Sequence, residues 1–347
     1  RPWEAALPDA GTSPQEVSRI FKIELPETRC ARRRIRKPDE QSLHLERADS
    51  IDKLDTCEWD RLHEASGCIA ASAMRVMEDV FGNESTSQQH WDFRYYVVRD
   101  ASGAPVLATC FTAALWKADM LSSASVSRAV ERRRETAPEF LTPRVFAMGT
   151  LLSEGEHPWL PEQAASMVSR RAIRLLLDAV RRDSELLRCD LRVIRDVPDS
   201  EVGLRDVLED AGFLRTPAPQ SWVLADVGAT DDELMTRLTQ RQRHHQRRQV
   251  HPFNEAFEVE FIAGDRARNG VEVDRLEALY RNVHSRSLEI NTFPLPVALI
   301  ERLVGAPDWE LSLFRRAGES EGEVVGFGFA FTGQPGLVPL FLGMDYS

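Results

Sequence analysis

A short loop contains two carboxylates and an imidazole, Glu154, Glu156 and His157, followed by Pro158 and Trp159. Carboxylates and imidazoles are the groups that proteins use most often to move protons, so this loop is a candidate for general acid or base chemistry. The alternative is a solvated loop in which the proline and the tryptophan anchor the next helix.

Asp345 is a second candidate, because it follows a strand-like apolar segment directly. A carboxylate at a strand end can act as a general base or bind a cationic group. It can equally cap a helix, since an aspartate oxygen accepts hydrogen bonds from the first backbone N–H groups of a helix. Both interpretations stay open from the sequence.

Arginines are concentrated in a helix-like segment at residues 231–250, among them Arg241, Arg243 and Arg247. They could contact the phosphates of a carrier such as coenzyme A or an aminoacyl-tRNA. The sparse apolar residues of the segment favour instead an exposed linker helix. Neither interpretation outweighs the other.

The composition limits the possible classes of protein. A net charge of −11 argues against bulk nucleic-acid binding, which favours a basic chain. No apolar run approaches the roughly 18 residues of a membrane span and no signal segment is present, so we expect a cytoplasmic protein. The cysteines form no CxxC pair and no HExxH motif is present, so we expect no metal site. P-loop and nucleophile-elbow motifs are absent as well. The start at Arg1 suggests a piece of a longer, multidomain polypeptide.

Apolar periodicity predicts the elements that must position these residues, and it predicts the same order twice: a strand, two helices and three antiparallel strands. The first copy has strands at 42–46, 93–99, 105–111 and 144–149, helices at 50–62 and 70–81, and a polar insert at 118–142. It continues with a helix at 162–182, a strand at 189–194, a helix at 201–211 and a strand at 221–225. The second copy has a strand at 257–262, helices at 272–288 and 296–304, and strands at 310–315, 324–331 and 338–342.

The domain organisation follows from this repeat. We expect an N-terminal extension or linker at 1–41, a first domain at 42–228, a basic linker helix at 229–256 and a second domain at 257–347 that is incomplete at its C-terminus.

The order of elements resembles the GNAT fold of acyl-CoA-dependent N-acyltransferases, and residues 208–213 resemble the helix, Gly-Phe and closing strand of that family. Segments 238–243, 325–329 and 342–345 resemble tandem GNAT-like proteins of the Fem peptidyltransferase type. The resemblance implies an α+β protein with two GNAT-like domains. Each would hold a mixed, mostly antiparallel sheet flanked by helices, and the second would be truncated.

The resemblance implies an N-acyltransferase. It would move an acyl group from an acyl-CoA thioester, bound as a substrate, to an amine of a small metabolite or cell-envelope precursor. One alternative is a peptidyltransferase that uses aminoacyl-tRNA. The other is a non-catalytic module of a multidomain biosynthetic protein.

The resemblance also implies roles for individual residues. Proton transfer would fall to Asp345, Glu154 and Glu156, and substrate contacts to His157, Trp159, His284, Asn291 and Phe293, although the last three suit core or capping roles as well. Donor contacts would come from Arg241, Arg243, Arg247, Gly343 and Met344.

The loop at 149–159 departs from the family pattern, which has a glycine-rich phosphate cradle there. Its two glutamates repel phosphate, so we do not expect the first copy to hold the carrier in the usual way. The equivalent loop of the second copy should start just after Ser347, so we expect the likeliest carrier site to be absent from this chain or only half built in it.

Overall fold

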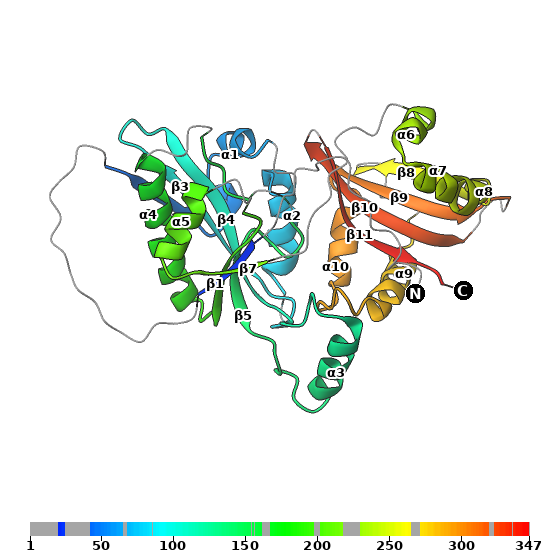
Figure 1. The fold of residues 1–347 in the computed structure, drawn as a ribbon, viewed down its shortest axis with the longest axis horizontal. Coiled ribbons are helices and arrows are strands. Elements are labelled where there is room, and N and C mark those ends of the chain that lie inside the picture. The colour runs from blue at the N-terminus through cyan, green and yellow to red at the C-terminus, as the bar shows by residue number, and fades with distance from the viewer. Residues whose placement is uncertain are drawn as a thin grey trace.

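The computed structural model describes residues 20–24, 42–64, 68–84, 86–153, 155, 157–161, 167–197, 202–217, 230–264, 271–318, 323–334 and 336–346. The protein is α+β, as the sequence predicts. A mixed sheet and a four-stranded antiparallel sheet are each flanked by helices (Figure 1). None of the helices within the described ranges has both the length and the apolarity needed to cross a membrane.

The first half builds the mixed sheet, with strands β2 to β6 side by side in chain order. Its elements are β2 (His44–Ala48), the 3-10 helix η1 (Ile51–Lys53), α1 (Thr56–Leu62), α2 (Ala71–Phe81), β3 (Asp92–Arg99), β4 (Pro105–Leu115), α3 (Ala124–Arg134), β5 (Arg144–Met148), α4 (Met167–Leu186), β6 (Leu191–Ile194), α5 (Val202–Asp210) and β7 (Leu214–Pro217).

The second half builds the four-stranded sheet in the order β11-β10-β9-β8. Its elements are β8 (Phe257–Ala263), α9 (Val273–Arg286), α10 (Val297–Leu303), β9 (Trp309–Arg316), β10 (Val324–Gln334) and β11 (Gly336–Met344). The predicted repeat of element order is therefore confirmed. β2 to β5 and β8 to β11 pair with their chain neighbours in the same antiparallel way.

The N-terminal region differs from the expectation. Strand β1 (Ile20–Glu24) lies between β6 and β7 and pairs antiparallel with both. The interpretation of residues 1–41 as an extension or linker missed this strand, because it is short and stands among prolines and arginines. The strand predicted at 221–225 lies outside the described residues.

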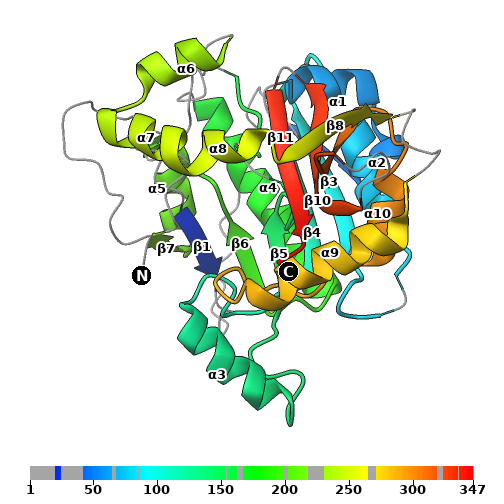
Figure 2. The same ribbon diagram turned by 90° about the vertical axis from the view of Figure 1, so that its right-hand side faces the viewer.

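The basic linker helix is broken into shorter pieces. They are α6 (Asp231–Arg237), α7 (Gln240–His245), the π-helical segment η2 (Gln246–Val250) and α8 (His251–Asn254). Leu238 is the C-cap of α6, and Thr239 starts α7 with a capping box. In this box the hydroxyl of Thr239 accepts from the N–H of Gln242, and the Gln242 side chain accepts from the N–H of Thr239. We call α6 to α8 the arm; it lies beside β8 (Figure 2).

One buried cluster joins the two halves. It contains apolar side chains of α2, β3 and β4 together with those of α9, α10, β9 and β10. A second cluster lies on the other face of the first sheet, where α4 and α5 pack on β3 to β6. The first sheet therefore has helices on both faces, and α2 and α10 pack against each other at the boundary between the halves (Figure 1).

β11 passes so close to α9 that position 343 has no room for a side chain, which explains the glycine there. A Cβ atom at this position would lie 2.6 Å from the backbone nitrogen of Tyr280 and 2.7 Å from the carbonyl carbon of Leu279. A Cβ at Gly328 on the neighbouring strand would have nothing within 4 Å.

We therefore expect Gly343→Ala to lower the free energy of unfolding by about 1–3 kcal/mol, because the backbone of α9 must shift. Gly328→Ala is the matched control and should leave stability unchanged or slightly raised. Urea unfolding of the two variants and the parent measures the difference. Equal midpoints for Gly343→Ala and Gly328→Ala would contradict the packing argument.

Candidate functional site

The first sheet opens between its parallel strands β5 and β6. Their ladder joins three residue pairs and ends at Ala147 and Val193. The described residues of the loop after β5 (149–153, 155 and 157–161) and the segment after β6 (195–197) meet beyond the last pair. We call this place the fork.

The loop after β5 turns back at Gly149, whose φ of +75° lies in the left-handed region that favours glycine. Its N–H donates to the carbonyl of Cys110 on β4 at 2.9 Å. A Cβ here would lie 2.2 Å from the ring of His157. The tight turn therefore folds the loop directly onto the histidine.

Three side chains in the fork are arranged like a Ser-His-Asp catalytic triad. The Oγ of Ser153 lies 2.7 Å from Nε2 of His157, and Nδ1 of His157 lies 3.5 Å from a carboxylate oxygen of Asp196. A serine, a histidine and an aspartate in this order can activate a hydroxyl as a nucleophile. Here Ser153 and His157 are each 1% exposed, so the hydroxyl is shielded from substrate.

Arg195 holds the fork closed. Its guanidinium donates to the carbonyl oxygens of Thr150, at 2.9 Å, and of Ser153, and its Nε donates to Asp196 at 2.8 Å. The side chain thus joins the end of β6 to the loop after β5. It also neutralises the carboxylate that faces His157.

Several backbone N–H groups of the loop already donate to acceptors within the protein. Gly149 donates to β4, Thr150 donates to the Oγ of Ser153 at 2.8 Å, and Leu152 donates to the Oγ1 of Thr150 at 3.1 Å. A phosphate cradle needs free N–H groups that point at the anion. These amides would have to leave their present acceptors to bind one.

A buried histidine lies next to the fork. The ring of His63, after α1, packs on the ring of Trp59 with centroids 4.1 Å apart, and its Nδ1 lies 3.1 Å from the carbonyl of Trp59. It also faces the backbone of Ala108 and His157. Burial is the main cause that lowers the pKa of His63 from 6.5 to about 4, so the ring is neutral at pH 7.

The sequence candidates of the first loop are placed only in part. His157 belongs to the fork. The backbone N–H of Trp159 donates to Ala108 on β4 at 2.8 Å, and its carbonyl accepts from Ala108 at 3.1 Å. Glu154 and Glu156 lie outside the described residues.

His284, Asn291 and Phe293 lie where the second half meets the insert that carries α3. The side chain of Asn291 donates to Asp119 at 2.8 Å and to Glu131 at 2.7 Å. The amide lies among ion pairs: a buried one between Arg134 and Asp119, and two partly buried ones that Lys117 and Arg134 form with Glu131. The ammonium of Lys117 also lies over the ring of Phe293. The Nε2 of His284 lies 3.0 Å from the carbonyl of Thr292, and burial lowers the pKa of His284.

The arginines of the arm are spread over its surface. Arg241 and Arg247 are exposed, and Arg243 is half-buried and donates to the carbonyl of Leu238. Exposed guanidinium groups on short helices suit contact with a polyanion, but they suit a solvated linker as well.

The last candidates lie at the end of β11. The carboxylate of Asp345 accepts from Arg275, in the first turn of α9, at 3.0 Å, and Glu323 shares the same guanidinium at 3.0 Å. Met344 is exposed, whereas Gly343 is buried against α9. The candidates thus fall at four positions in the fold: the fork, the α3 junction, the arm and the end of β11.

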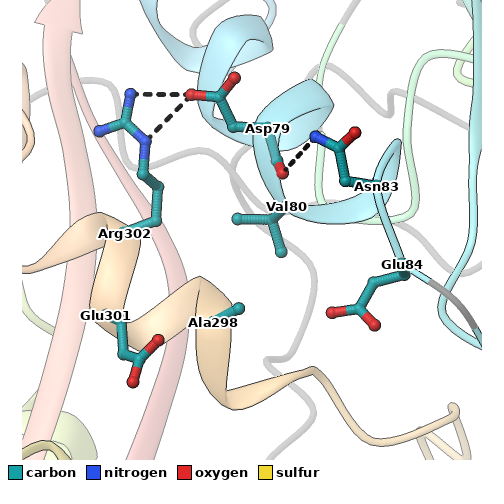
Figure 3. A pocket seen from close by; sticks show the side chains of 7 residues that line it. All are labelled: Asp79, Val80, Asn83, Glu84, Ala298, Glu301 and Arg302. Atoms are coloured by element: carbon teal, nitrogen blue, oxygen red, sulfur yellow. Dashed lines mark hydrogen bonds and ion pairs between the residues drawn. The ribbon is translucent and has the colours of Figure 1, made fainter.

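A groove of about 450 Å³ lies between α2 and α10. Figure 3 shows its lining, in which Arg302 of α10 reaches Asp79 of α2, with N–O distances of 3.0 and 3.1 Å. Glu84 and Glu301 add two more carboxylates. We call it the acidic groove; its ion pair is exposed and spans the boundary between the two halves.

Sequence reasoning missed Ser153, Asp196 and Arg195. Ser153 stands four positions before His157, a spacing that could have drawn attention to it. Asp196 and Arg195 come from the far end of the next strand, and only the pairing of β5 with β6 brings them to the loop. Among the described residues, no group of three or more acidic, histidine or cysteine side chains could hold a metal ion.

No protein-family model and no curated protein matches this chain.

The pKa of His63 leads to a prediction about stability. The imidazole of His63 binds a proton less readily in the folded state than in the unfolded state. Its neutral ring therefore contributes fully to the free energy of unfolding above pH 6.5, and this contribution is lost as the pH falls towards 4. The size of the loss is about 3 kcal/mol.

We expect the free energy of unfolding of the parent to fall by about 3 kcal/mol more between pH 7 and pH 4 than that of His63→Gln. The substitution of an exposed histidine, His44→Gln, is the control and should keep the pH dependence of the parent. Parallel pH profiles for the parent and His63→Gln would contradict the assignment.

Proposed function

We propose that the chain is an N-acyltransferase of tandem GNAT-like type, which moves an acyl group from a thioester to a primary amine. The observation that supports this most is the repeated order of strand, two helices and three antiparallel strands, with the same sheet pairing in both halves. The opening of the first sheet between the parallel strands β5 and β6 is a second support, because the sheet of that fold also opens at this position.

The donor is assigned to the second half in this proposal. The fork of the first half is filled by Arg195, His157 and Asp196, and several of the described loop amides already have acceptors. The end of β11 is the equivalent position in the second sheet. Asp345 stands there with its carboxylate held by Arg275.

The reaction requires one proton acceptor near the amine. The amine nitrogen attacks the thioester carbonyl carbon, the C–S bond breaks, and the thiolate leaves and takes up a proton. The nitrogen loses a proton to a carboxylate, for which we propose Asp345, either directly or through water. The products are an amide and a free thiol.

A specific observation favours aminoacyl-tRNA as the alternative donor. The arm presents the exposed arginines Arg241, Arg247 and Arg248 beside the second sheet. The filled fork favours a third possibility for the first half alone, a non-catalytic module that positions the second half.

Asp345→Asn tests the enzymatic proposal. Incubation with acetyl-CoA and a panel of primary amines, with release of the free thiol as readout, should give turnover for the parent. Turnover should fall about 100-fold or more in Asp345→Asn. Glu323→Gln removes the other carboxylate partner of Arg275 and should keep turnover within about twofold, since it stands outside the proton path.

Two results would overturn the proposal. One is the absence of both thiol release and any thermal shift with acetyl-CoA. The other is full turnover in Asp345→Asn, which would remove the carboxylate from the mechanism.

The alternative donor has its own test. If aminoacyl-tRNA binds the arm, Arg241→Ala with Arg243→Ala should weaken retention of tRNA and reduce the slope of log K against log salt by about 2. Arg132→Ala with Arg133→Ala, two exposed arginines of α3, is the matched control. If the slope of log K against log salt is equal for the two double variants, the arm does not bind tRNA and serves only as a linker.

A further inference from the structure

The arm buries none of its side chains. Among the described residues, no side chain of α6, α7, η2 or α8 is buried. Helices of this length are marginal in water unless an apolar face packs on the rest of the protein. The arm is therefore an element whose side chains remain available to a partner.

Positive charge is concentrated in the arm. Residues 237–254 contain five arginines and neither aspartate nor glutamate, although the whole chain has a net charge of −11. Arg241, Arg247 and Arg248 are exposed, and within the part of the chain that the structure describes none of them forms an ion pair with a carboxylate. A cationic segment without its own counter-charges is complementary to an anionic surface.

Apolar side chains follow these arginines directly. Val250 is 37% exposed, Phe253 of α8 is 58% exposed, and Phe257, the first residue of β8, is 42% exposed. Phe257 pairs with Arg316 of β9, which is exposed as well. α7 leads through η2 into α8 beside β8, so guanidinium groups and exposed aromatic rings occur together at this end of the second half (Figure 2).

This combination of side chains fits the interface of an anionic membrane. Guanidinium groups bind headgroup phosphates there, and aromatic and aliphatic side chains enter the boundary between the headgroups and the acyl chains. A nucleic acid also offers phosphates, together with bases on which aromatic rings stack. The aliphatic side chain of Val250 has no such stacking contact, whereas a lipid interface takes up aliphatic and aromatic side chains alike.

The distribution of charge also favours a surface that meets the arm alone. The acidic groove between α2 and α10 lies away from the arm in Figure 1 and in Figure 2. A flat membrane can contact one end of the protein and leave its acidic parts in water. A nucleic acid longer than the arm would extend toward the acidic remainder of the chain, which repels it.

We infer that the arm docks the protein on an anionic lipid surface. Arg241, Arg247 and Arg248 contact headgroup phosphates, and Val250 and Phe253 enter the boundary between headgroups and acyl chains. The contact is peripheral, because the helices lie on the interface and only side chains enter it. The inference goes beyond the acyl transfer proposed above and does not depend on it.

Flotation of the intact chain with unilamellar vesicles in low-salt buffer tests the inference. We expect the protein to float with vesicles of phosphatidylcholine that contain about 30% phosphatidylglycerol, and to stay behind with phosphatidylcholine alone. Arg247→Ala with Arg248→Ala should lower the partition coefficient about 30-fold, because each arginine near an anionic membrane contributes about fivefold. Arg132→Ala with Arg133→Ala removes the same charge from exposed positions of α3 and should change the coefficient less than about twofold.

The apolar contact has its own pair of variants. Phe253→Ser should lower the partition coefficient about tenfold, because its ring leaves water on binding. Phe140→Ser is the control at another exposed phenylalanine, with 39% of its surface exposed, and should change the coefficient less than about twofold. All of the exchanged side chains are exposed, so circular dichroism and thermal unfolding of every variant should match the parent.

Four outcomes contradict the inference. The first is that the parent floats with neither kind of vesicle or equally with both, and the second is an equal partition coefficient for the two double variants. The third is retention of bulk tRNA that Arg247→Ala with Arg248→Ala abolishes, without flotation of the parent, which makes the arm a nucleic-acid surface. The fourth is an unchanged partition coefficient in Phe253→Ser, which leaves no place for the aromatic ring in the lipid interface.

Discussion

The packing of α2 against α10 is the interaction on which the rest of the structure depends. These helices stand between the two sheets, and one buried cluster runs through them from β3 and β4 to β9 and β10. Removal of apolar surface from water contributes about 25 cal/mol for each Å², so a cluster that serves both sheets stabilises both at once. The ion pair of Arg302 with Asp79 and the polar junction around Asn291 add specificity at the same boundary.

This shared cluster explains why the chemistry-bearing residues stand where they do. It fixes one face of each sheet, so the strand ends and the opposite faces are the parts of the sheets that stay available for function. In the first half the opposite face is filled by α4 and α5, and the strand ends are closed by Arg195 and His157. In the second half, among the described residues, the opposite face has exposed apolar side chains such as Phe261 and Leu342, and the strand end carries Asp345.

Much of the fold was predictable because its elements carry strong local patterns. The hairpin of β3 and β4 has β-branched and aromatic runs on both sides of a turn, and Gly103 takes the positive φ, +86°, that the turn requires. The order of elements in both halves followed from such patterns. β1 was not predicted, because five residues among prolines give no periodic signal. The arm was expected to be one helix, whereas the capping box at Thr239 starts a new helix within it.

The candidate site was less predictable. His157 was identified from its residue type, but its partners were not, since Ser153 and Asp196 are unremarkable in sequence. The roles expected for Asn291 and Phe293 came from their place near helix ends. The contacts that surround them belong to an insert distant in the chain.

The sequence by itself determined the α+β class, the order of the elements and which side chains of each element are apolar, because these depend on neighbours three or four positions away at most. The tertiary structure decided which loop closes the fork, which carboxylate faces which cation and which face of each sheet packs on helices. Those outcomes depend on contacts between residues far apart in the chain, and the residue types at either end of such a contact do not specify the partner.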